Sequence, residues 1–213
     1  MKTDALIDML ANSAGAIEPG FALRRFAIAA AIGTGGAALL MATILGPRHD
    51  FAYAVRLPMF WVKLAFVASL AGLGTMGAWR LSMPARPIGS IPRAIVAVVA
   101  GIWLIAAFAL AQHAPHGRIA LVLGSTWTSC PWLIAGLSVP VFVALAWAMK
   151  GMAPTRLRRA GAMAGFASGA VAAFVYSIHC PELGAPFLGT WYLAGIAVPA
   201  AVGTLLGERL FRW

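Results

Sequence analysis

The chain has 213 residues, of which 62% are hydrophobic and only 10% are charged, and its formal net charge is +10. Soluble globular domains carry about 25% charged residues, so this composition excludes a soluble enzyme, a secreted disulfide-rich domain and a disordered segment. Because each crossing of a bilayer takes about 20 apolar residues, the length accommodates six spans and leaves no room for a separate soluble catalytic domain.

Six apolar stretches predict an all-α membrane protein with six transmembrane helices. They lie at residues 26–45, 59–79, 95–111, 131–149, 160–178 and 187–206. The chain then divides into an N-terminal tail at 1–22 and a transmembrane domain at 23–213. Residues 119–129, which lead into the fourth stretch, are expected to lie along the membrane interface or to enter it as a short re-entrant element.

The positively charged residues are distributed unevenly between the two ends of these stretches. With the N-terminus inside, twelve of the sixteen Lys and Arg residues fall on the cytoplasmic side. The other side holds Arg48, Arg56, Lys63 and Arg118, and Lys63 is expected to extend its ammonium group to the membrane surface. The positive-inside rule therefore predicts cytoplasmic termini, and it accounts for the basic charge without direct nucleic-acid binding.

Glycine spacing predicts one close helix contact. Gly161, Gly165 and Gly169 recur every four residues in the fifth stretch, so they share one helix face. Small residues on one face allow a neighbouring helix to approach closely. We therefore expect this face to pack against another helix.

An internal repeat links the fourth and sixth stretches. Residues 132–140 and 191–199 match at Trp, Ala-Gly and Val-Pro, and both stretches are predicted to run from the outside to the inside. Parallel repeats of this kind occur in membrane folds. Pro140 and Pro199 are expected to bend both helices at similar depth. Chance similarity among apolar segments is the alternative explanation.

The two cysteines are the strongest candidates for chemistry. Cys130 and Cys180 are each followed by proline, and the predicted topology puts both at the outer level of adjoining antiparallel spans. Pro131 suits the first position of a helix, where the helix dipole favours a thiolate at Cys130. The pair could form a disulfide or bind a soft metal ion such as Cu(I). A structural disulfide, or two unreactive buried thiols, explains the same pattern equally well.

The histidines extend this hypothesis. His179 precedes Cys180, so Cys130, Cys180 and His179 are the candidate metal ligands, with a copper or cadmium ion as a signal and no obligatory cofactor. His113 and His116 have metal-like spacing, but the proline between them favours a solvated loop. No histidine lies mid-span to hold a b-type haem. The sequence contains no Ser/His/Asp or paired-carboxylate arrangement, and we expect no enzymatic activity.

The N-terminal tail carries three of the six acidic residues of the chain. A short helix over residues 3–10 would have three apolar side chains on one face and two aspartates on the other. Such a helix is marginal in water, so it is expected to fold against a basic partner such as a DNA- or polymerase-binding protein. A tail that lies on the membrane is the alternative. The residues expected to contact the partner are Asp4, Leu6, Ile7, Asp8 and Leu10.

Three short segments stand out beside the apolar stretches: MKTDALIDML at 1–10, WTSCPW at 127–132, and HCPE at 179–182 followed by GTWY. Together they resemble the negative-regulator-of-sigma-F (NrsF) family, and the resemblance covers essentially the whole chain. It implies a multi-pass anti-sigma factor of the bacterial inner membrane. Such a protein holds an extracytoplasmic-function (ECF) sigma factor at the cytoplasmic face and releases it under metal or oxidative stress. The resemblance also implies that Cys130 and Cys180 are the sensing pair and that the tail docks the sigma factor.

Two functions of different classes remain at this point. In the first, the protein is a regulator whose cysteine pair responds to heavy metal or oxidant. In the second, it is a small membrane carrier or redox partner that uses two outer thiols to transfer metal or electrons. Ion and proton paths need ionisable residues inside the spans, and the sequence leads us to expect essentially none, which favours the regulator.

Overall fold

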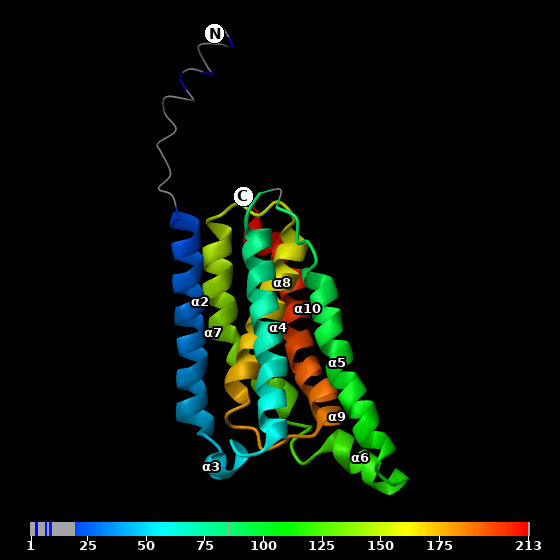
Figure 1. Ribbon diagram of the computed structural model, residues 1–213. Helices are drawn as coiled ribbons and strands as arrows, with labels where there is room; N and C mark the ends of the chain where they lie inside the picture. Colours follow the sequence, from blue (N-terminus) through cyan, green and yellow to red (C-terminus); the bar gives the residue numbers. More distant parts are fainter. Residues whose placement is uncertain (1–2, 4–6, 8, 10–19, 85, 213) are drawn as a thin grey trace.

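A computed structural model describes Thr3, Ile7, Met9, residues 20–84 and residues 86–212. In this part the chain is helical and forms no strand, as the sequence predicts. The long helices stand side by side as a bundle, and the connections between them gather at its two ends (Figure 1).

The helix boundaries follow the prolines of the chain. The long helices are α2 (Phe21–Leu40, continued by the π-helix η1 at Met41–Leu45), α4 (Pro58–Ser82), α5 (Ile91–Ala111), α7 (Cys130–Lys150), α8 (Leu157–Tyr176) and α10 (Leu193–Phe211). The short elements are α3 (Phe51–Ala54), α6 (Pro115–Leu123), α9 (Ala185–Phe187) and the π-helix η2 (Leu188–Tyr192). A proline occupies the first turn of α4, α5, α6, α7 and α9, where a helix leaves its N–H groups unpaired and a proline costs nothing.

Five helical stretches of the described chain are long and apolar enough to cross a membrane. They are Phe21–Leu45, Pro58–Ser82, Ile91–Ala111, Cys130–Lys150 and Ala185–Phe211, which correspond to the first four and the sixth predicted spans. The fifth predicted span folds as α8, a helix of 20 residues that is rich in Ala and Gly and carries Arg158 and Arg159 in its first turn. These residues make α8 less apolar than the other five.

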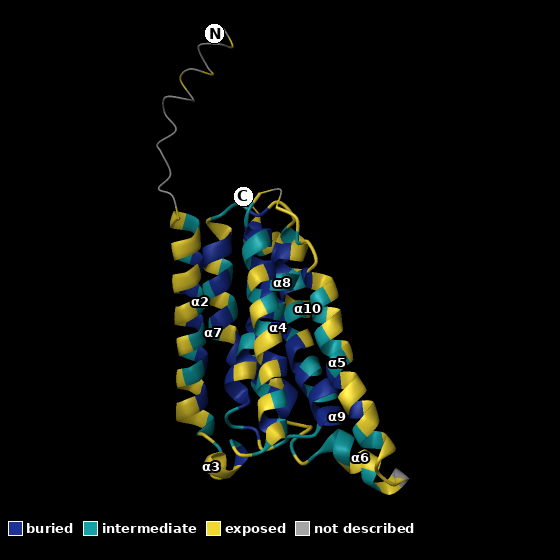
Figure 2. Cartoon of the chain, in the orientation of Figure 1, coloured by how far each residue is buried: buried dark blue, intermediate teal, exposed yellow. Residues whose placement is uncertain are grey.

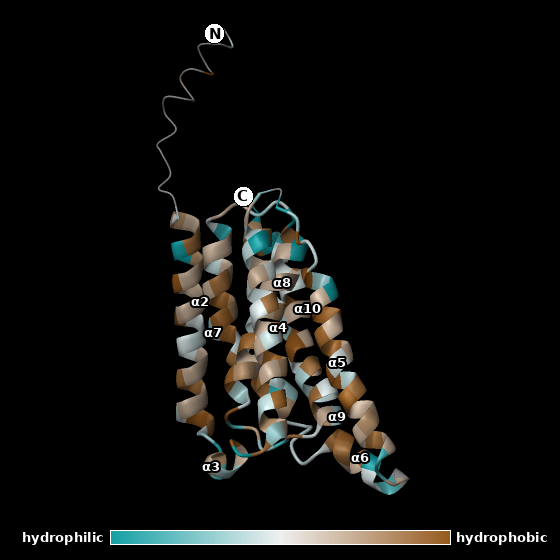
Figure 3. Cartoon of the chain, viewed as in Figure 1, coloured by the Kyte–Doolittle hydropathy of each residue, from teal (hydrophilic) through white to brown (hydrophobic). Residues whose placement is uncertain are grey.

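The position of α8 explains its composition. It packs against α10, α4 and α7, and most of its residues are buried (Figure 2). Gly161 and Gly165 lie against the α10 backbone at Gly203 and Pro199, where an added methyl group would collide with carbonyl oxygens. The predicted glycine face therefore does pack against a neighbour. A helix enclosed by protein needs small residues more than large apolar ones. Helix α5, by contrast, is hydrophobic over most of its length (Figure 3).

The repeated segment at 132–140 lies in α7, whereas the one at 191–199 begins in η2 and continues into α10. Pro140 lies inside α7 and Pro199 lies inside α10. A Cβ atom on Gly36 of α2 would meet the Pro140 ring at 3.1 Å, and one on Gly169 of α8 would meet the Pro199 ring at 2.8 Å. Each proline thus packs on a glycine of the helix beside it, and the internal repeat stays a prediction with chance similarity as its alternative.

The two ends of the bundle differ in charge. The basic end, as we name it, contains the start of α2 and the end of α10 (Figure 1). Eleven of the fifteen Lys and Arg residues that the structure describes belong to it: Arg24, Arg25, Arg80, Arg86, Arg93, Lys150, Arg156, Arg158, Arg159, Arg209 and Arg212. The opposite end, named the thiol end, contains both cysteines, α3 and α6. Helix α6 begins four residues before the predicted element at 119–129, and turns complete the connection to Ser129.

Candidate functional site

Cys130 and Cys180 lie together in the interior of the thiol end. Cys130 is the first residue of α7, as the following proline predicts, and its backbone N–H donates to Thr126 at 2.9 Å. Cys180 follows the end of α8, and its N–H donates to Tyr176 at 3.0 Å. Both are fully buried free cysteines, and Cys130 is the neighbour that lowers the pKa of Cys180 most. The structure therefore brings together the two residues that the sequence singles out.

Lys63 belongs to the same cluster, and the expectation that it reaches the membrane surface is wrong. Its side chain is 0% exposed. The ammonium Nζ donates to the backbone carbonyls of Cys180 at 2.8 Å and Glu182 at 3.0 Å. It also lies 5.2 Å from the centre of the Tyr192 ring. The carbonyls that follow α8 have no helical partner, so a buried cation that pairs with two of them satisfies all three groups.

Glu182 ties the segment that follows Cys180 to the segment that precedes Cys130. Its Oε1 accepts hydrogen bonds from the Ser125 N–H at 2.7 Å and the Ser125 hydroxyl at 2.6 Å. Gly124 makes this approach possible: its φ is +56°, and a Cβ there would lie 2.8 Å from the Glu182 carboxyl. The two cysteine-bearing connections are thus joined through one carboxylate.

Two buried tyrosines form the wall of the cluster. The rings of Tyr176 and Tyr192 are 5.9 Å apart, and both are almost completely buried. The Tyr192 hydroxyl has no hydrogen-bond partner within the described residues. Tyr192 also ends the π-helix η2, and π-helical turns occur frequently at functional sites. The thiols therefore share their surroundings with one ammonium and two phenols.

Cys180, which lies in the connection outside the helices, is the thiol best prepared to ionise. A hydrogen bond from Cys130 and then the charge of Lys63 lower the pKa of Cys180, although burial acts in the opposite direction. The thiolate is the nucleophilic and metal-binding form of cysteine. Of the two cysteines, Cys180 is therefore the one whose thiolate form is favoured.

His179 is held in place through one of its two ring nitrogens. Its Nδ1 forms a 2.8 Å hydrogen bond with the carbonyl of Gly46, at the end of η1. Nearby, Arg48 pairs with Asp50 through two bonds of 2.6 Å and lowers the pKa of that carboxyl. No three His, Cys, Asp or Glu side chains of the described chain converge in a group that could hold a metal ion. A metal site of Cys130, Cys180 and His179 stays a prediction, and the two thiols are its best-placed members.

The predicted docking residues lie mostly outside the described part of the chain. Asp4, Leu6, Asp8 and Leu10 are not described, whereas the side chain of Ile7 is 57% exposed. Lys63, Glu182 and the two tyrosines are the residues that sequence reasoning missed. One signal for Lys63 was present, because it is the only charged residue within the six apolar stretches.

These features define a class: an all-helical protein with membrane-length apolar helices, a buried thiol pair at one end and clustered arginines at the other. The chain belongs to the NrsF family, described as negative regulator of sigma F, whose family model matches residues 10–213. It is 53% identical to the "Probable anti-sigma-F factor NrsF" of Azospira oryzae and 40% identical to the "Anti-sigma-F factor NrsF" of Caulobacter vibrioides, over the whole of each chain. No solved structure matches the chain. The resemblance seen in the sequence is therefore confirmed.

Proposed function

We propose that this protein is an anti-sigma factor of the bacterial inner membrane that sequesters an ECF sigma factor and releases it when Cys130 and Cys180 meet heavy metal or oxidant. The observation that carries the proposal is the burial of two free thiols against each other, at the end of the bundle opposite the basic end. The printed names of the two relatives support a sigma factor as the partner.

The proposed topology has six spans, with α8 as the fifth. Lys and Arg concentrate on the cytoplasmic side of bacterial membrane proteins, so the basic end would face the cytoplasm together with both termini. The thiol end would then face the periplasm, where oxidants and metal ions arrive first. The tail that includes Asp4, Leu6, Ile7, Asp8 and Leu10 would emerge beside the basic end and dock the sigma factor.

The chemistry of the signal needs only the two thiols and the stimulus. An oxidant such as a peroxide accepts two electrons while both thiols lose their protons, and a disulfide bond joins Cys130 to Cys180. A soft ion such as Cu(I) or Cd²⁺ instead displaces the thiol protons and binds both sulfurs. Either event changes the separation of the two sulfurs, so the start of α7 would move relative to the segment held by Lys63 and Glu182.

Helix α7 offers a direct route to the cytoplasmic end. It begins at Cys130, and near its other end the carbonyl of Trp147 accepts a 3.1 Å hydrogen bond from Arg25. The Arg25 guanidinium also lies 4.1 Å from the centre of the Trp147 ring. Arg25 belongs to the first turns of α2, directly after the tail. A displacement of α7 would therefore reach the point from which the tail leaves the membrane.

Metal binding or disulfide formation can supply the free energy that this switch requires. A shift of a two-state equilibrium from 1:99 to 99:1 takes about 5.5 kcal/mol of differential binding. Thiolate–metal bonds and disulfides supply energies of this order.

The test measures sigma-factor retention on membranes before and after addition of copper, cadmium or diamide. We expect the intact protein to retain the sigma factor and to release it on treatment. Cys130→Ser and Cys180→Ser should retain it without releasing it, whereas the neighbouring control Ser129→Ala should respond normally. Normal release by both cysteine variants would refute sensing by this pair.

A second variant tests the docking segment. Deletion of residues 1–20 should abolish retention and give constitutive sigma-dependent transcription. Retention by the shortened protein would move the docking surface to the connections of the basic end, at 80–93 or 156–159.

A further inference from the structure

Two hollows lie between α7 and α10, one beside the basic end and one nearer the middle of the bundle, and we name them together the α7–α10 groove. Its upper part, of about 300 Å³, is lined by Lys150, Arg209 and Phe142 among others. Its lower part, of about 130 Å³, is lined by Phe142, Pro199 and Val139 among others and is almost wholly apolar. The two parts meet at Phe142. The groove therefore has positively charged residues at its opening, which we call its mouth, and apolar residues in its lower part, which we call its floor.

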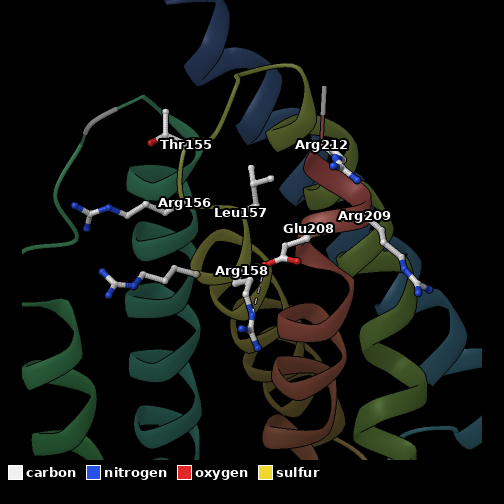
Figure 4. A pocket seen from close by; sticks show the side chains of 8 residues that line it. Thr155, Arg156, Leu157, Arg158, Glu208, Arg209 and Arg212 are labelled. Atoms are coloured by element: carbon white, nitrogen blue, oxygen red, sulfur yellow. Dashed lines mark ion pairs between the residues drawn. The ribbon is translucent and has the colours of Figure 1, made fainter.

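The mouth adjoins a larger basic hollow between α8 and α10. Arg209 lines both the groove and this hollow of about 940 Å³, whose other cations are Arg156, Arg158, Arg159 and Arg212 (Figure 4). The hollow contains one carboxylate, Glu208, which pairs loosely with Arg158 at 3.9 Å. Together with Lys150 of the groove, the residues of the hollow include six cationic side chains and one anionic side chain, and all seven are exposed. This excess of positive charge favours an anionic ligand, and guanidinium groups bind phosphate especially well.

The groove is long enough to hold one acyl chain. From Ala135 to Lys150 the wall on α7 rises about 22 Å at 1.5 Å per residue. Half of the hydrocarbon core of a bilayer is about 15 Å thick. The apolar lower part also favours a lipid over a protein as the ligand. A water-soluble acidic protein could contact the arginines, but it could not reach the depth of Pro199.

We propose that the α7–α10 groove binds an anionic phospholipid, with the phosphate between Lys150 and Arg209 and one acyl chain along Phe142 to Pro199. The site is separate from the thiol cluster, and the proposal does not depend on a sigma factor. Basic pockets between transmembrane helices bind anionic headgroups in this way.

The test uses the full chain in detergent and counts retained lipids by native mass spectrometry after addition of phosphatidylglycerol or phosphatidylcholine. We expect preferential retention of phosphatidylglycerol. Each cation near a membrane surface contributes about fivefold in affinity, so Lys150→Gln with Arg209→Gln should weaken retention about 25-fold. The matched control, Arg86→Gln with Arg93→Gln, removes the same charge at the same end outside the groove and should retain the lipid.

Groove-filling variants separate a lipid from other anions. Ala146→Phe in the upper part, or Val139→Trp at an exposed position of the lower part, fills the groove without a change of charge and should reduce phosphatidylglycerol retention several-fold. Equal retention of the two lipids by the unaltered protein would overturn the proposal. Unchanged retention in both filled variants, with displacement of the lipid by inorganic phosphate or by an acidic peptide, would also overturn it and assign the arginines to a soluble anion or a protein.

Discussion

The ammonium of Lys63 lies 2.8 Å from the backbone carbonyl of Cys180, a residue 117 positions further along the chain. This bond fixes the connection between α8 and α9 to the side of α4. Because the same ammonium also holds the carbonyl of Glu182, the segment that carries Cys180 is restrained on both sides of its proline. The conformation of Cys180 is therefore set by a side chain from a different helix.

Replacement of Lys63 by methionine should destabilise the protein. The change leaves two buried carbonyls unpaired, and each such loss costs about 1–3 kcal/mol, partly offset because no charge has to be buried. We expect a lower temperature of unfolding for Lys63→Met in detergent than for Lys150→Met, which removes an exposed ammonium. Equal stability of the two variants would show that Lys63 does not hold this segment.

The acidity of Cys180 should be measurable as a pH-dependent property. Its pKa is lowered in the folded protein, so its thiolate persists below the ordinary value of about 8.5 and disappears as the pH falls through the lowered pKa. The stability that this ionisation contributes, and the affinity of the pair for Cd²⁺, should be lost over the same interval.

The measurement is a titration of the ultraviolet absorbance of the thiolate. Cys130→Ala should raise the midpoint because it removes the hydrogen bond that lowers the pKa most, and Lys63→Met should raise it further. Cys180→Ala, as the control for assignment, should eliminate the low-pH step. A midpoint for the unaltered protein at about 8.5 or above would contradict the prediction.

Arg25 should connect α7 to the tail. Arg25→Gln removes both the 3.1 Å hydrogen bond to Trp147 and the contact with its ring, so we expect sigma-factor retention with a reduced release on metal or oxidant. Arg24→Gln is the matched control, since the exposed Arg24 is the preceding residue of the same helix. A transcription assay that finds the same induction in both variants would exclude transmission through Arg25.

Gly165 should tolerate no side chain. A methyl group there collides with the carbonyl of Pro199, and overpacking of this kind costs about 1–3 kcal/mol. Gly35→Ala is the control: a Cβ at that position meets no atom within 4 Å, and alanine favours a helix over glycine by about 0.5–1 kcal/mol. Thermal unfolding should therefore show Gly165→Ala as destabilised and Gly35→Ala as unchanged or slightly stabilised; the reverse order would contradict the α8–α10 packing.

The sequence predicts those features that depend on local chemistry. Proline in a first turn places the start of α7 at Cys130, and alternating helix direction brings Cys130 and Cys180 to one level. The spacing of the glycines in α8 identifies the face that packs closely, but it does not identify α10 as the helix that packs there. These inferences need only helix geometry and the length of each apolar stretch.

The features that sequence reasoning misses depend on tertiary contacts. The sequence predicts Lys63 at the surface because its position near a span end allows a long side chain to reach water. Whether it does so depends on the unpaired carbonyls of Cys180 and Glu182, which become neighbours only after folding. Likewise, the low apolarity of α8 follows from its enclosure by three other helices, which no window of its own residues reveals.

The glycine contact between α8 and α10 has a mechanical consequence. Two helices whose backbones touch along their length cannot slide or rotate independently, so they move together as one rigid beam. The beam is about 30 Å long at 1.5 Å per residue and runs from the neighbourhood of Cys180 to that of Arg209. A tilt of this beam displaces both of its ends, so a change near Cys180 would also move the surroundings of Arg209 without a chain of polar groups between them.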